Sequence, residues 1–130
     1  MNTNLIKFLV KLKNASLSQK EAIIVKYNFL YLDLVKVLYR EGLIQSFQIE
    51  KHGVQGSLHI RIILRYFYNK SVFKNLRIFS KPSHVKYLKY SDICKIIDKK
   101  FIFLLSTNKG LLTSLECKKR KVGGKLLFMC

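Results

Sequence analysis

The spacing of apolar residues predicts that the chain begins with an amphipathic helix followed by a strand. Apolar side chains at Leu5, Phe8, Leu9 and Leu12 fall on one face of a helix, and lysines lie on the opposite face. The short β-branched run at residues 22–27 is typical of a strand.

The next segment predicts a second helix and a β-hairpin. Asn28 is a suitable N-cap for a helix over residues 30–41, and Gly42 suits the left-handed residue that ends such a helix. Runs that alternate between apolar and polar residues then flank the glycine-containing connection at residues 52–56, which is typical of a hairpin. The order α-β-α-β-β predicts a two-layer α/β unit over residues 1–66.

The rest of the chain, residues 67–130, predicts a mainly β unit with one or two short helices, so the expected fold class is α+β. Residues 67–71 are expected to be the junction. Strands are expected over residues 73–80, 84–90, 101–106 and 123–130, the last entered through paired glycines. Ser91 is expected to cap a short helix that ends at Asp98.

The net charge of the chain indicates which type of partner it binds. Lys and Arg number 25 against seven Asp and Glu, which gives a net charge of +18. Residues 66–130 hold 15 basic and three acidic residues, so this half carries +12 and residues 1–65 carry +6. Each phosphate that a basic side chain neutralises releases counterions, which favours a long RNA or DNA over a small-molecule substrate. The C-terminal half is therefore the expected contact surface.

The sequence predicts no metal site, no cofactor and no membrane span. Cys94, Cys117 and Cys130 lie far apart without the spacing of a zinc site, and their odd number favours a reducing compartment over a disulfide framework. The longest apolar run, residues 101–105, has five residues, whereas a membrane helix needs about 20.

The turn within LLSTNKGLL, residues 104–112, is the main candidate binding site. A phosphate-binding loop is disfavoured because the first glycine of that motif is missing, the order is Lys-Gly rather than Gly-Lys, and no long helix follows. Asn and Gly suit a hairpin turn, since both accept positive φ. Such a rigid turn would expose a platform of donors for sugar and phosphate oxygens: Ser106, Thr107, Asn108 and Lys109.

Other residues of the C-terminal half are further candidates for nucleic-acid contact. Tyr87 lies next to Lys86 and is placed to stack on an unpaired base, although packing within a strand explains it equally well. The basic run Lys118, Lys119, Arg120 and Lys121 is expected to contact phosphates.

Catalysis has weaker support. Ser80, Ser83 and His84 lie close together, but no orienting acid or nucleophile elbow accompanies them, and a polar turn explains them better. The chain has only seven acidic residues, which disfavours a nuclease because nucleases hold their catalytic metal ions with carboxylates.

Four stretches together resemble the family of small-subunit ribosomal protein eight. They are REGLIQSF, LRIFSKPSHVKY, LLSTNKGLLT and VGGKLLF; they follow the family's order, and the similarity covers essentially the whole chain. The resemblance implies an N-terminal α-β-α-β-β unit packed closely on a mainly β unit that contacts an irregular RNA helix. It implies a non-enzymatic protein that binds the central domain of the small-subunit rRNA, beside neighbouring small-subunit ribosomal proteins, and supports its folding and assembly.

The resemblance extends to individual residues. The family's Ser-Thr-Ser-x-Gly loop corresponds to residues 106–110, of which the first three would hydrogen-bond the RNA minor groove. Tyr87, which follows the turn containing Lys81 and Pro82, would shape the same surface. The full set of expected RNA contacts is Ser106, Thr107, Asn108, Lys109, Gly110, Tyr87, Lys81, Pro82, Lys86, Lys118, Lys119, Arg120, Lys121 and Lys125.

Three residues depart from the family pattern. Asn108 replaces the second serine of the loop, Ser83 replaces a glycine, and Lys125 stands where bacterial members often have Glu. The change at Lys125 exchanges an acceptor for a cation, so a hydrogen bond from that position to a base does not carry over.

The composition indicates an AT-rich genome, because Lys outnumbers Arg 20 to 5 and Ala occurs only twice. With the resemblance, this predicts an organelle-encoded protein of the mitochondrial small ribosomal subunit; a plastid or the bacterial cytoplasm are the alternatives.

The alternative function is a basic RNA-processing enzyme or a subunit of one. Attachment of the N-terminal helix to a membrane surface is disfavoured, since most of the charge lies elsewhere.

Overall fold

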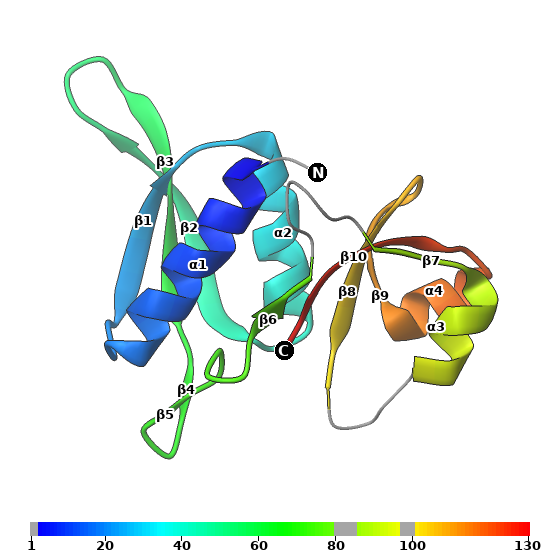
Figure 1. Cartoon of the computed structure of the whole chain (residues 1–130). Coiled ribbons are helices and arrows are strands. Elements are labelled where there is room, and N and C mark those ends of the chain that lie inside the picture. The colour runs from blue at the N-terminus through cyan, green and yellow to red at the C-terminus, as the bar shows by residue number, and fades with distance from the viewer. Residues whose placement is uncertain (1–2, 80–85, 97–100) are drawn as a thin grey trace. The chain divides into compact units, whose positions relative to one another are not determined.

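The computed structural model describes residues 3–79, 86–96 and 101–130. The chain divides into an N-terminal unit of residues 7–74 and a C-terminal unit of residues 75–130 together with residues 1–6. Helices and antiparallel sheets make up the described elements, which confirms the α+β class (Figure 1). The predicted division between residues 66 and 67 stays a prediction.

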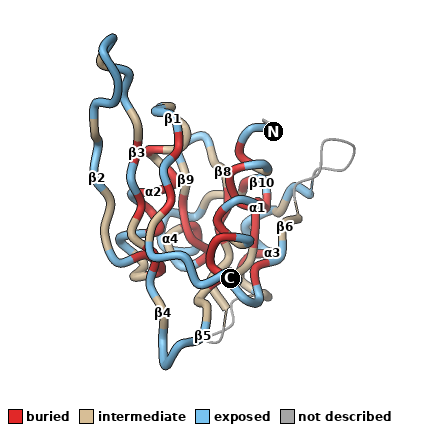
Figure 2. The backbone as a smooth tube through the Cα atoms, turned by 90° about the vertical axis from the view of Figure 1, so that its left-hand side faces the viewer, coloured by how far each residue is buried: buried red, intermediate tan, exposed pale blue. Residues whose placement is uncertain are grey.

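The N-terminal unit has the predicted order α-β-α-β-β. The elements are α1 (Thr3–Leu17), β1 (Ala22–Lys26), α2 (Phe29–Arg40), β2 (Ile44–His52) and β3 (Ser57–Leu64). The strands form an antiparallel sheet in the order β1-β3-β2. Phe8 of α1 stacks on Tyr31 of α2 at a centroid distance of 4.8 Å, and Ile60 and Ile62 of the central strand are fully buried. Figure 2 colours the buried residues of the chain red. The core therefore combines the apolar faces of both helices with that of the sheet.

The two predicted ends of α2 are confirmed. The Asn28 side chain accepts a hydrogen bond from the Leu30 N–H at 3.0 Å, as an N-cap does. Beyond the helix, Gly42 has a φ of +74° and the Leu43 N–H donates to the Leu38 carbonyl oxygen at 2.9 Å. A glycine at this position lets the chain turn sharply into β2.

The segment expected to be the junction, residues 67–71, belongs to a small hairpin. Strands β4 (Tyr66–Phe67) and β5 (Lys70–Ser71) pair antiparallel. The two residues that connect these strands, Tyr68 and Asn69, both have positive φ.

The C-terminal unit is built on an antiparallel sheet around strand β10. The elements are β6 (Arg77–Ile78), β7 (Tyr87–Leu88), α3 (Tyr90–Ile96), β8 (Phe103–Thr107), β9 (Gly110–Thr113), α4 (Ser114–Arg120) and β10 (Gly124–Met129). Strand β10 pairs with β8 along one edge and with β6 and β7 along the other, and β9 pairs with β8. A buried cluster joins α3 and α4 to the sheet: Ile93, Leu105, Leu112, Cys117 and Leu126.

Two of the strands predicted for this unit are far shorter than expected. Of residues 73–79, the part of this segment that the structure describes, only β6 forms a strand, and Phe73 and Leu76 bury their side chains from an irregular stretch. In the described part of residues 84–90, only β7 is extended.

The helix predicted from Ser91 begins earlier than expected. Ser91 lies inside α3 rather than at its N-cap, and the Asp92 side chain accepts a hydrogen bond from the Lys89 N–H at 3.4 Å. The predicted helix end at Asp98 and the predicted turn at residues 81–83 lie outside the described residues.

Helix α4 carries a complete capping box at its N-terminus. The Glu116 N–H donates to Thr113 Oγ1 at 3.4 Å, and the Thr113 N–H donates to Glu116 Oε2 at 3.1 Å. Two backbone donors are thereby satisfied at a buried helix start.

Removing this cap is expected to destabilise the protein. Thr113→Ala should lower the free energy of unfolding by about 1 kcal/mol, because the Glu116 N–H loses its acceptor. Chemical denaturation measures the change. Lys119→Ala, at an exposed position of the same helix, is the control and should change stability by less than about 0.5 kcal/mol. Equal losses in the two variants would contradict a stabilising role for the cap.

Candidate nucleic-acid interface

The turn between β8 and β9 is fixed by its own hydrogen bonds. Thr107 pairs with Gly110, and Asn108 and Lys109 form the connection. Thr107 Oγ1 donates to the Gly110 carbonyl oxygen at 2.8 Å and accepts from the Lys109 N–H at 3.1 Å. Gly110 has a φ of +102°, whereas Asn108 and Lys109 do not adopt positive φ. The glycine makes the bend, as predicted, and the asparagine does not share that task.

An open pocket of about 450 Å³ lies beside this turn. Its lining combines Tyr87, Ser106, Thr107 and Asn108 with the segment Val122, Gly123, Gly124 and Lys125. Five of the expected RNA contacts therefore meet at one site, and they come from β7, β8, the turn and β10.

The strand register explains how these residues meet. Lys125 of β10 pairs with Ser106 of β8 on one side and with Tyr87 of β7 on the other. Residues directly opposite in neighbouring antiparallel strands point to the same face of a sheet. The Tyr87 side chain is 64% exposed, so packing within the strand does not account for it.

The other expected contacts that the structure describes do not line the pocket. Lys118, Lys119 and Arg120 are exposed in the last turn of α4, and Lys121 ends that helix with a φ of +54°. The chain passes from Lys121 directly into the pocket at Val122. Lys86 Nζ lies 5.3 Å from the centroid of the Phe79 ring. Lys81 and Pro82 lie outside the described residues.

The arrangement combines shape, polar groups and positive charge on one unit. Comparison with known proteins identifies the family of the chain. The family model described as Ribosomal protein S8 matches residues 4–130. The chain belongs to the ribosomal protein S8 family.

Bacterial relatives support the assignment to the S8 family. A protein of Anaeromyxobacter sp. (strain K) is 32% identical over 120 residues, covering 92% of this chain and 89% of the relative. A protein of Streptococcus uberis is 31% identical over 128 residues, covering 98% and 96% respectively. Both are named small ribosomal subunit protein uS8. Membership of the S8 family places the chain among structural ribosomal proteins and not among enzymes.

Paired glycines allow the strands of this S8 chain to approach closely. A Cβ atom at Gly124 would lie 2.5 Å from the Ser106 carbonyl oxygen and 2.8 Å from Thr107 Cγ2. A Cβ atom at Gly123 would lie 2.6 Å from the Leu88 carbonyl oxygen. The sequence predicts these glycines as the entry to a strand and not as part of the site. Their pairing next to a strand was the available signal, since glycine there marks a close approach of backbones.

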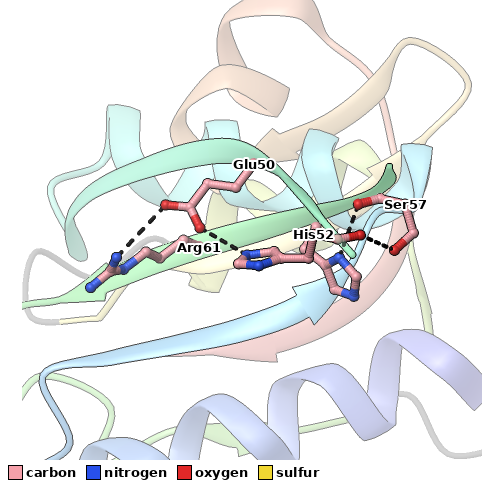
Figure 3. A network of polar contacts seen from close by, with 5 residues as sticks. Glu50, His52, Ser57 and Arg61 are labelled. Atoms are coloured by element: carbon pink, nitrogen blue, oxygen red, sulfur yellow. Dashed lines mark hydrogen bonds and ion pairs between the residues drawn. The ribbon is translucent and has the colours of Figure 1, made fainter. Parts of the chain in front are cut away.

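A polar network of the N-terminal unit holds a carboxylate between two basic side chains. Glu50 Oε2 lies 2.9 Å from His52 Nε2, and Glu50 Oε1 lies 3.7 Å from Arg61 Nη1 (Figure 3). All three side chains are partly exposed, so the network contributes little to stability.

Across the described residues, no group of three His, Cys, Asp or Glu side chains is arranged to hold a metal ion.

Two of the cysteines, Cys117 and Cys130, have thiols that are poor nucleophiles at neutral pH. Burial raises the pKa of the Cys130 thiol to about 11, and burial together with Glu116 raises the pKa of the Cys117 thiol. Both thiols are therefore mostly protonated near pH 7, and the thiolate, which is the reactive form, is scarce.

Among the described segments, no helix is long and apolar enough to cross a membrane.

A side chain at position 124 is expected to damage the site. Gly124→Ala should lower the free energy of unfolding by about 1–3 kcal/mol, because β10 must move away from β8 to relieve the clash with the Ser106 carbonyl oxygen. Circular dichroism during chemical denaturation measures the loss.

Gly53→Asn is the matched control for Gly124→Ala. No atom lies within 4 Å of a Cβ at Gly53, and asparagine tolerates its φ of +82°. A change below about 1 kcal/mol is therefore expected for the control. If the two variants lost equal stability, strand approach would not be the reason for the glycine at position 124.

Proposed function

We propose that this S8 protein is a constituent of the small ribosomal subunit that binds the central domain of the small-subunit rRNA and supports its folding and assembly. The observation that carries the proposal is the register of β7, β10 and β8, which aligns Tyr87, Lys125 and Ser106 on one face. The C-terminal half, which contains this face, also carries most of the charge. The partners are this rRNA and neighbouring small-subunit ribosomal proteins.

The residues of the site divide into base-reading and phosphate-binding groups. Ser106 and Asn108 provide polar groups for the wide minor groove of A-form RNA, where base edges and 2′-hydroxyls are accessible. The exposed Tyr87 ring provides a flat surface for an unpaired base. The basic residues 118–121 bind phosphates and supply affinity that does not depend on sequence.

Thr107 has a different role from the one its place in the loop first suggested. Its hydroxyl proton is donated to the Gly110 carbonyl oxygen, and its oxygen also accepts from Lys109. We therefore assign Thr107 to shaping the turn, and direct donation to RNA to Ser106 and Asn108.

The compartment is a separate part of the proposal. The lysine-rich, alanine-poor composition favours an organelle-encoded protein of the mitochondrial small subunit. The relatives named above are bacterial, which also fits the bacterial cytoplasm.

Binding experiments on the full chain separate recognition from electrostatic attraction. Ser106→Ala should weaken binding to a central-domain rRNA fragment about fivefold, the value of one hydrogen bond of about 1 kcal/mol, and leave binding to random duplex RNA unchanged. Filter binding over a range of salt concentrations measures both affinities. Equal losses on the two RNAs would remove the specific role of the loop.

Lys118→Ala with Lys119→Ala is the matched control for Ser106→Ala. It should weaken binding to both RNAs alike and reduce the slope of log K against log salt by about one for each lysine that contacts a phosphate. A wild-type protein whose rRNA binding shows no salt dependence would contradict the proposed mechanism.

A further inference from the structure

The β4–β5 hairpin of the N-terminal unit exposes two aromatic rings. The Phe67 side chain is 62% exposed and the Tyr68 side chain is 87% exposed. The two rings contact each other edge to face, with centroids 4.8 Å apart. Exposed apolar residues are common singly, but an adjacent pair fixed in mutual contact is typical of a surface that binds something.

The backbone of the turn presents Tyr68 in a strained conformation. Tyr68 has a φ of +50° and Asn69 a φ of +62°, as both central residues of a type I′ hairpin turn do. Asparagine adopts this conformation readily, whereas a bulky aromatic residue rarely does. The Tyr68 ring is too exposed for packing to offset this strain, which favours a role outside the unit.

Hydrogen bonds hold the hairpin against the end of α1 and the loop that follows. Ser71 and Ser16 share a hydrogen bond between their hydroxyls, and the Tyr66 hydroxyl donates to the Lys20 carbonyl oxygen. Gln19 Nε2 donates to the Asn69 carbonyl oxygen at 3.3 Å. The rings are therefore presented on a fixed support.

The charges near the rings select an anionic partner. Lys70 lies directly opposite Phe67 in the strand pair, and it is exposed. Residues 65–74 include Arg65, Lys70 and Lys74 and no acidic residue. A flat aromatic surface beside a lysine is the combination by which proteins bind unpaired nucleotides.

We propose that Phe67 and Tyr68 form a second RNA-binding site, in which an unpaired base stacks on the exposed Tyr68 ring and Lys70 binds the adjacent phosphate. This inference rests on the proposed function, because the partner is again RNA. The second site lies on a different unit from the pocket at Ser106. An acidic peptide would interact with Lys70 and would leave the ring faces unused, so a nucleotide fits the surface better.

The test measures binding of the full chain to a short single-stranded oligoadenylate by fluorescence anisotropy. Tyr68→Asn should weaken this binding about tenfold, because it removes the ring while asparagine retains the positive φ of the turn. Tyr68→Phe should retain wild-type affinity, since it keeps the aromatic surface. Phe29→Asn, which removes a ring that is 67% exposed elsewhere in the same unit, should also leave the affinity unchanged.

Two further measurements separate this site from the pocket. Tyr68→Asn should weaken oligoadenylate binding by the same factor when Ser106→Ala is also present, and it should not change binding to duplex RNA. Ultraviolet irradiation with an iodouridine-containing oligonucleotide should crosslink to the peptide of residues 66–70. Wild-type affinity in Tyr68→Asn, or equal losses in Tyr68→Asn and Phe29→Asn, would overturn the second site and leave the proposal for Ser106 intact.

Discussion

The close approach of β10 to its neighbours is the constraint on which the candidate interface depends. Positions 123 and 124 have no room for a Cβ atom, because carbonyl oxygens of β8 and β7 lie within 2.6 Å of where it would be. Only glycine allows β10 to enter between these strands. Once the strand is placed there, pairing of backbone groups fixes Lys125 between Tyr87 and Ser106. The arrangement of side chains at the candidate interface therefore depends on glycine at positions 123 and 124.

The same strand also anchors the C-terminal unit. Lys125 is exposed, but Leu126, Leu127 and Phe128 are all buried, although a regular strand would point alternate residues to opposite faces. The pairing with β8 shifts in register between Leu126 and Phe128, and an irregularity of this kind breaks the alternation. One end of β10 thus lines the candidate interface, while the other end belongs to the core. A substitution near the bulge would affect both.

Local patterns predicted the N-terminal unit better than the C-terminal unit for a physical reason. The face of α1, the cap at Asn28 and the alternation in β3 each repeat over several residues, so the sequence alone reveals them. Strands β6 and β7 have two residues each, too few to show a period, and they depend on pairing with the distant β10. The polar turn at residues 106–110 was recognisable from its composition. The alignment of Tyr87 with Lys125 was not, because it arises only from register.

The structure brings two of the predicted departures from the S8 family pattern into one pocket. Asn108 lies on the turn and Lys125 lies on β10, and both line the same open volume. Asn108 retains donor and acceptor capacity, whereas a lysine at position 125 only donates and adds positive charge beside Ser106. A base that paired with a carboxylate at this position would meet a repelling partner, and an acceptor such as a phosphate or a guanine edge would be favoured. Because the two residues share a site, their effects on RNA choice should be coupled rather than additive.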